Sequence, residues 1–187
     1  MNRQPIVRIR AALGRLFLFL VVALLPGATG WAAEQNLEIV IWKSERRLEV
    51  NEGGRTLKSH RVGLGTHPIG TKVREGDGRT PEGTYYVCVK NPKSRFHLSL
   101  GISYPTPADA ARGLRDRLIT PAQHDAIVAA HRKRTTPPWN TALGGEIFIH
   151  GCGSSSDWTL GCVALDDDAM TELFDLVPIG TKIEIRP

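Results

Sequence analysis

Short β-favouring segments separated by Gly- and Pro-rich turns dominate the chain from residue 37 onwards. Leu37–Lys43 alternates apolar and polar residues, and Arg46–Val50 repeats the pattern. The polar residues Asn51–Gly54 then predict a hairpin turn. Further on, Gly and Pro recur every few residues around pieces such as Thr84–Val89. Many short strands joined by tight turns favour a β-sandwich or barrel over βαβ units, so we expect a mainly β fold.

Helical segments interrupt this pattern in the middle of the chain. Ala108–Leu118 is rich in Ala and Arg, and Thr120 before Pro121 is typical of a helix N-cap followed by proline at the first position. The prolines within Thr135–Asn140 end this region because proline cannot continue helical hydrogen bonding. We therefore expect a helical insertion, and we expect it to cover part of the binding cleft.

The C-terminal third returns to β structure around one helix. Gly145–His150 is predicted to be a buried strand, and Thr181–Pro187 a terminal strand. The acidic run Asp166–Asp168 opens an amphipathic helix between them. Adjacent carboxylates on one helical turn point in different directions, so we interpret the run as helix capping rather than as a metal site. We expect neither a metal nor a cofactor.

The N-terminus has the layout of a secretory signal peptide. Four arginines precede the apolar run Leu16–Leu25, and Gly30 and Ala32 satisfy the small-x-small rule for cleavage after Ala32. Roughly ten apolar residues are too few to cross a bilayer core, which needs about twenty. We expect residues 1–32 to be a signal peptide and residues 33–187 to be one domain, exported and without a stable membrane span after cleavage.

The charge of the chain excludes a nucleic-acid partner. The formal net charge is +5, and the four N-terminal arginines contribute +4 of it. Without residues 1–32 the domain is close to neutral. It has no basic tract of the kind that binds a phosphate backbone.

Three cysteines are an odd number for an exported domain. Cys88 and Cys152 either form a disulfide, which leaves Cys162 free, or both pack separately as small buried residues. Under both alternatives Cys162 remains available for chemistry.

The segment from Phe148 to Asp168 carries the chemistry. An apolar strand ends in His150, a loop of small and polar residues follows, and Cys162 comes twelve positions after the histidine. A thiol reacts as its thiolate, and a nearby imidazole can remove its proton. Gly161 next to the cysteine permits backbone angles that other residues avoid, and the N–H groups of that turn could face an oxyanion.

These residues resemble a known signature. His150-Gly151, a variable loop and Thr159-Leu-Gly-Cys-Val163 are similar to the motif of the L,D-transpeptidase catalytic domain (YkuD) family. The similarity extends through Gly76–Val87, Phe96–Pro105 and Val177–Ile185. It implies an L,D-transpeptidase-like β-sandwich with a helical insertion and a short C-terminal helix.

The resemblance also implies an activity in the periplasm. The cysteine takes an acyl group from a peptidoglycan stem peptide at the L-centre of the diamino acid in the third position, and the terminal D-alanine leaves. The thioester then passes to an amine on another stem, or on an envelope protein. Peptidoglycan stem peptides are thus the expected partners.

Site residues follow from the same resemblance. Cys162 is the nucleophile, His150 is the general base and later the acid, and Gly161 is the permissive neighbour. The hydroxyl of Thr159 either orients the histidine or substrate, or stabilises a turn. The carbonyl of Gly151 would hold the imidazole tautomer.

Three further side chains are candidates for substrate contact. His97 follows Arg95 and precedes Ser99 at strand spacing, so all three should share one face. We expect His97 and Arg95 to contact the stem peptide, with a solvent-facing His97 as the alternative. Trp158 should line the rim of the pocket.

One position departs from the family pattern. Ala164 stands where the best-known members have an arginine that would hold a carboxylate or polarise the site. Some relatives of this form cleave bonds instead of forming them. A peptidoglycan amidase or carboxypeptidase with water as acceptor is therefore the alternative enzyme, and a non-catalytic murein-binding module is a more distant one.

Overall fold

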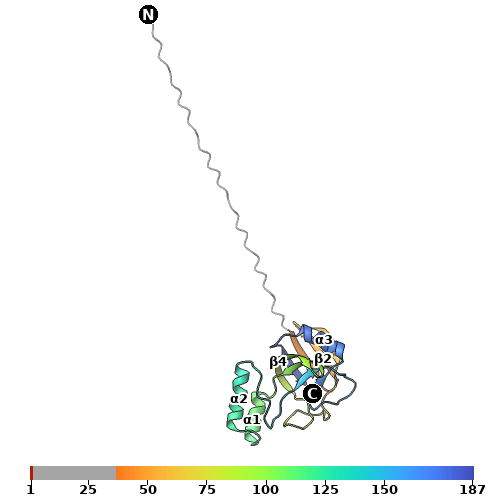
Figure 1. Cartoon of the computed structure of the whole chain (residues 1–187), viewed down its shortest axis with the longest axis vertical. Coiled ribbons are helices and arrows are strands. Elements are labelled where there is room, and N and C mark those ends of the chain that lie inside the picture. Colours follow the sequence, from red (N-terminus) through yellow and green to blue (C-terminus); the bar gives the residue numbers. More distant parts are fainter. Residues whose placement is uncertain (2–36) are drawn as a thin grey trace. The chain divides into compact units, whose positions relative to one another are not determined.

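Eight strands of the described region form one mixed sheet, which confirms the expected mainly β fold (Figure 1). The computed structural model describes Met1 and residues 37–187, so the predicted signal peptide lies outside the described residues. The strands are β1 (Leu37–Trp42), β2 (Arg47–Glu52), β3 (Arg55–Arg61), β4 (Gly83–Ser94), β5 (His97–Ile102), β6 (Phe148–His150), β7 (Val163–Ala164) and β8 (Lys182–Arg186). Their spatial order is β3-β2-β1-β8-β4-β5-β6-β7.

The first three strands and the last one form one half of the sheet. β1 pairs antiparallel with β2, placing Ile39 opposite Val50, and β1 pairs parallel with β8, placing Ile39 beside Ile183. All three side chains are buried in the main hydrophobic core. The C-terminal strand therefore closes the sheet next to the first strand, because its alternating apolar residues meet that core.

β4 joins this half to the half that carries the cleft. Its first residues pair with β8, with Tyr85 opposite Ile183, and its later residues pair with β5, with Val87 opposite Ile102. The register shifts along the β4–β5 pair, which bends and twists the strands locally. β6 then adds to β5, and the two-residue strand β7 adds to β6 in parallel.

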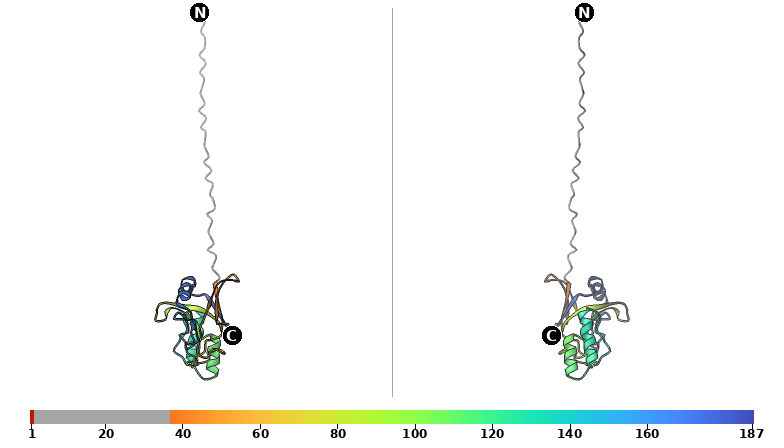
Figure 2. Two further views of the ribbon diagram at one scale, coloured as in Figure 1. Left: turned by 90° about the vertical axis from the view of Figure 1, so that its right-hand side faces the viewer. Right: turned by 90° about the vertical axis from the view of Figure 1, so that its left-hand side faces the viewer.

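Helices α1 (Pro107–Arg115) and α2 (Pro121–Arg132) form the predicted insertion. Figure 2 shows them side by side in green and teal. Each begins at a threonine in a capping box, and Thr120 caps α2 with Pro121 in its first turn, as the sequence predicted. Together with the residues that follow them, they bury a small apolar cluster of their own, Ala110, Ile119, Ile127 and Leu143.

Helix α3 (Asp167–Leu176) packs near β5 and carries Met170 and Leu173 into the main core. In the region from Leu37 to the C-terminus, no helix is both long enough and apolar enough to span a membrane.

We predict that Ile149→Ala lowers the free energy of unfolding by about 3 kcal/mol, since the side chain is fully buried and its removal leaves a cavity. Urea unfolding followed by circular dichroism measures the change. Ile69→Ala is the matched control, because Ile69 is 87% exposed and should lose almost nothing. Equal effects of the two variants would contradict this account of the core.

Candidate active site

A cleft of about 870 Å³ contains both His150 and Cys162. Its walls come from the segment between β3 and β4, from the end of β4 and the turn to β5, from the segment 144–148, and from the loop between β6 and β7. Arg95, Trp158 and Thr159 also line it. No residue of α1 or α2 in the described chain does, so the expectation that the helices cover the cleft was wrong. Trp139 and the segment 144–148, which follow the helices in the chain, line the cleft instead.

Parallel pairing of β6 and β7 brings the histidine and the cysteine to one face. Ile149 pairs with Val163 and His150 with Ala164, so Cys162 lies opposite Phe148. The Phe148 N–H donates to the Cys162 Sγ at 3.4 Å. Because alternate residues of a strand share a face, Phe148 and His150 both point toward the side on which the sulfur lies.

The resting site holds a neutral thiol beside a neutral imidazole. Burial raises the pKa of Cys162, although the Phe148 N–H acts in the opposite direction. Burial also lowers the pKa of His150, which the hydrogen bond to Gly151 only partly offsets. The Sγ contacts the Glu146 carbonyl at 3.6 Å, and no hydrogen bond joins ring and thiol within residues 37–187. Burial thus disfavours the charged form of both groups.

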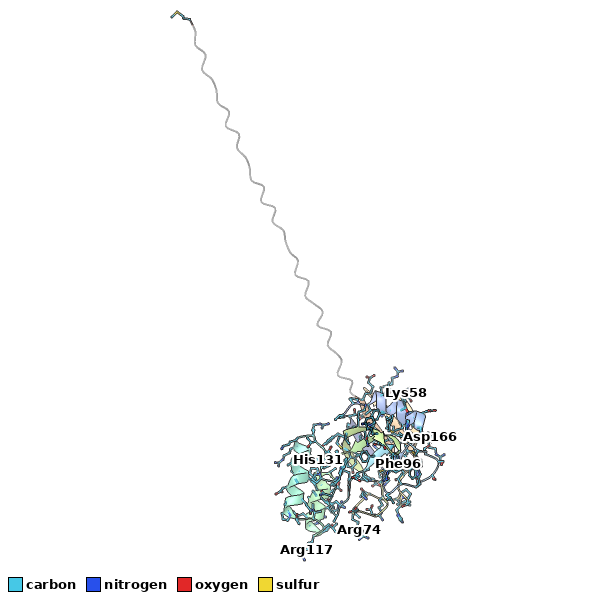
Figure 3. The ribbon with its side chains drawn as sticks, viewed as in Figure 1. Lys58, Arg74, Phe96, Arg117, His131 and Asp166 are labelled. Atoms are coloured by element: carbon cyan, nitrogen blue, oxygen red, sulfur yellow. The ribbon has the colours of Figure 1, made fainter. Side chains whose placement is uncertain are left out.

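The imidazole is held in one tautomer between two aromatic rings. Its Nδ1 lies 2.8 Å from the Gly151 carbonyl oxygen, so Nδ1 carries the proton and Nε2 is free to accept one. Phe96, labelled in Figure 3, stacks on the ring at 4.8 Å between centroids, and Trp158 meets it edge-on at 5.5 Å. The Gly151 N–H donates to the Phe96 carbonyl. Phe96 was not among the residues predicted from sequence, since nothing in its local pattern points to the histidine.

Carboxylates at the start of α3 hold the loop that follows the histidine. Asp167 Oδ1 accepts the Cys152 N–H at 2.7 Å, and Asp166 Oδ1 accepts the N–H and the hydroxyl of Ser154. Asp166, at the N-terminus of α3 in Figure 3, makes no capping hydrogen bond with its side chain. The aspartates do open the helix, but the prediction that Asp166 caps it with its carboxylate was wrong, because the loop uses that carboxylate.

A second anchor holds the far part of the same loop. Asp157 pairs with Arg46 at 2.7 Å and accepts the Leu64 N–H at 2.9 Å. Burial opposes ionisation of Asp157, but the hydrogen bonds from Arg46 and Leu64 bring its pKa below the usual value. The loop is thus tied down at both ends.

Thr159 and Gly161 shape the turn into the cysteine. The Thr159 hydroxyl accepts the Gly161 N–H at 3.1 Å and donates to the Cys162 carbonyl at 2.7 Å, which are the contacts of a turn-stabilising residue. Gly161 has φ +131°, and a Cβ there would lie 2.7 Å from the Arg79 carbonyl oxygen. Glycine is therefore required by the backbone and by this close approach.

Arg95 and His97 do not share a face. Arg95 lines the cleft and lies over the Phe96 ring, whereas His97 lies outside the cleft with its Nε2 2.8 Å from the Thr171 hydroxyl. The turn between β4 and β5 shifts the register, and His97 has φ +68°. Period-two alternation fails at this turn, so the expectation that Arg95 and His97 share one face was wrong, and His97 is exposed, as the alternative for this residue expected.

All three cysteines are free. Cys88 is half-buried and its thiol donates to the Gly101 carbonyl at 3.3 Å, while Cys152 is exposed. The disulfide alternative is therefore wrong, and the alternative that both cysteines are buried fails for Cys152. Among residues 37–187, no group of three or more His, Cys, Asp or Glu side chains is placed to hold a metal ion.

Comparison with known families gives a match over almost the whole described region. A family model described as the L,D-transpeptidase catalytic domain matches residues 36–185. A protein of Escherichia coli K12, YafK, whose curated name assigns it provisionally to the L,D-transpeptidases, is 27% identical over 146 residues. The alignment covers 74% of this chain and 46% of YafK, so the chain spans about half the length of this relative.

Solved structures share the fold at low identity. The helical cell shape determining protein Pgp2 from Campylobacter jejuni gives a TM-score of 0.57 at 22% identity, covering 80% of this chain and 47% of that one. Bd1075 from Bdellovibrio bacteriovorus gives a TM-score of 0.54 at 22% identity, covering 81% and 48%. At these identities the likeness describes the fold alone.

We predict that Phe96→Ala raises the pKa of His150, because removing the stacked ring admits water and relieves the burial that disfavours the charged imidazole. NMR titration of the His150 ring protons measures it. Phe174→Ala, which truncates another partly buried ring beside Lys90, should leave the value unchanged. An unchanged or lower value in Phe96→Ala would argue against burial by this ring.

Proposed function

Because the chain belongs to the L,D-transpeptidase catalytic domain family, we propose that it is an exported enzyme that transfers acyl groups of peptidoglycan stem peptides through a thioester on Cys162. The observation that carries the proposal is the placement of Cys162 and His150 on neighbouring β segments facing one cleft. Since the chain spans about half of its curated relatives, the activity is proposed for this domain by itself.

Acylation uses the tautomer that Gly151 holds. Nε2 of His150 takes the thiol proton while the sulfur attacks the carbonyl carbon at the L-centre of the diamino acid. Thr159 already accepts the Gly161 N–H, so we assign the oxyanion to the N–H of Cys162 itself. When the tetrahedral intermediate collapses, His150 returns the proton to the departing amine of D-alanine.

Deacylation completes the transfer. An amine of another stem peptide, or of an envelope protein, attacks the thioester carbonyl, loses its proton to His150 and forms an amide. The sulfur leaves as a thiolate, and His150 then returns the proton to it. Arg95 on the cleft rim, together with Trp158, is proposed to contact the stem peptide. A cleft of this volume can accommodate an extended peptide segment.

Water is the alternative acceptor. Ala164 supports hydrolysis as the second candidate reaction. The Ala164 side chain is fully buried, and its backbone pairs with Gly63. No side chain from this position reaches the cleft, so the cation of the best-known members is missing. An amidase or carboxypeptidase would use the same cysteine and histidine. A non-catalytic murein-binding module would need neither residue.

We predict that Cys162→Ala abolishes activity on purified muropeptides, because no thioester can form. Product analysis by mass spectrometry identifies the reaction: cross-linked dimers indicate transfer, and shortened stems indicate hydrolysis. Cys152→Ala is the matched control, since this exposed thiol lies on the same loop and should be dispensable. Full activity in Cys162→Ala would eliminate the thioester mechanism.

We also propose export with cleavage after Ala32. Expression of the full chain in a Gram-negative host should give a periplasmic product whose intact mass is that of the chain starting at Ala33. Replacing Ala32 by Arg removes the small residue that the peptidase needs and should retain the longer form. A cytoplasmic product of full length from the unmodified chain would contradict export.

A further inference from the structure

A buried lysine lies in the wall of the cleft. Lys72, from the segment between β3 and β4, is only 2% exposed and lines the cleft that contains Cys162. Its Nζ donates to the Arg74 carbonyl at 3.0 Å and to Asp77 Oδ1 at 2.9 Å. An ammonium group has three N–H donors, and these contacts use two. One N–H donor of the ammonium group is not used by these contacts.

Asp77 fixes this ammonium group in place. Its carboxylate accepts backbone N–H groups of Val73 at 2.7 Å, Arg74 at 3.1 Å and Arg79 at 3.1 Å. Burial opposes ionisation of Asp77, but these hydrogen bonds and the one from Lys72 bring its pKa below the usual value. The carboxylate is anchored to backbone on several sides, so Lys72 is held rigidly instead of moving as a surface lysine does.

The charged groups around the sulfur differ in sign. Burial raises the pKa of Cys162, the Phe148 N–H and the charge of Lys72 act against that effect, and the carboxylate of Glu146 acts with it. His150 lines the same cleft from β6. The remaining charged groups of the cleft are Glu75, Lys93 and Arg95, all on its exposed rim. Lys72 is thus the buried cation of the cleft, in a chain that has Ala164 where the best-known relatives have arginine.

We propose that Lys72 is a positioning residue of this cleft, a fixed cation that stabilises negative charge on the Cys162 sulfur. Lys72 supplies a positive charge from the segment between β3 and β4, in place of the arginine that is absent at Ala164. The inference rests on the proposed function, because it assumes that the sulfur becomes anionic during the reaction. It requires no contact between Lys72 and the substrate.

The chain offers a matched control in Lys43. This lysine is also 2% exposed, and its Nζ donates to two backbone carbonyls and to a carboxylate, those of Gly70, Thr80 and Glu82. Both lysines therefore tie down the segment between β3 and β4. Only Lys72 lines the cleft. Comparing the two single substitutions therefore separates the effect of the Lys72 charge on the sulfur from the effect of losing support for the segment.

The test is the pH dependence of alkylation of Cys162 by iodoacetamide, followed on the Cys162 peptide by mass spectrometry. The thiolate sulfur forms a bond to carbon as iodide leaves, so the rate reports the thiolate fraction whether or not the protein transfers acyl groups. Lys72→Met should move the midpoint up by about one pH unit, which is about tenfold slower alkylation at neutral pH. Lys43→Met should leave the midpoint unchanged.

A second uncharged variant keeps the test decisive if Lys72→Met does not fold. Lys72→Gln removes the charge but keeps an N–H donor for the Asp77 carboxylate, and it should raise the midpoint in the same direction. An unchanged midpoint in the folded Lys72 variants, or an equal rise in Lys43→Met, would overturn the proposal. If the alkylation midpoints change as expected but the protein transfers no acyl group, only the proposed function is rejected.

Discussion

The parallel pairing of β6 with β7 is the contact on which the candidate site depends. Two residue pairs, Ile149 with Val163 and His150 with Ala164, set the register that brings Cys162 to the same side as the histidine. Parallel neighbours usually need a long crossover, commonly a helix. Here an irregular loop makes the connection. The N–H groups of Cys152 and Ser154 in this loop donate to carboxylates at the start of α3, and the loop's own Asp157 accepts the Leu64 N–H, which explains how so short a connection keeps a defined shape.

The segment between β3 and β4 supports the site from the other side. The Thr80 hydroxyl accepts the Gly65 N–H and approaches the Cys162 carbonyl at 3.5 Å, while the Arg79 carbonyl lies against Gly161. A side chain at Gly161 would collide with that carbonyl. The turn that presents the sulfur therefore packs against a segment distant in sequence, so the nucleophile can be positioned accurately before substrate arrives. The buried ion pairs of Lys43 and Lys72 keep this supporting segment in place.

Burial has opposite consequences for the two central groups. It disfavours the thiolate of Cys162 and the imidazolium of His150, so the charged pair is the unfavourable state at rest. A neutral thiol in a half-closed cleft is protected from oxidation, which matters for an enzyme proposed to work in an oxidising compartment. The reaction then requires charge stabilisation that appears together with the attack. The backbone N–H at the sulfur and the rigid ammonium of Lys72 are suited to that task, because neither has to reorganise.

The sequence by itself determined the strands, the capped helices of the insertion and the pairing of His150 with Cys162, because alternation, capping and motif spacing are local properties of the chain. Only the tertiary structure decided which neighbours distant residues have. It turned His97 toward α3, used Asp166 for the loop instead of for its helix, stacked Phe96 on the imidazole, and buried Lys72 in the cleft wall. These outcomes depend on turns that break strand periodicity and on contacts between residues far apart in the chain, and no local pattern encodes either.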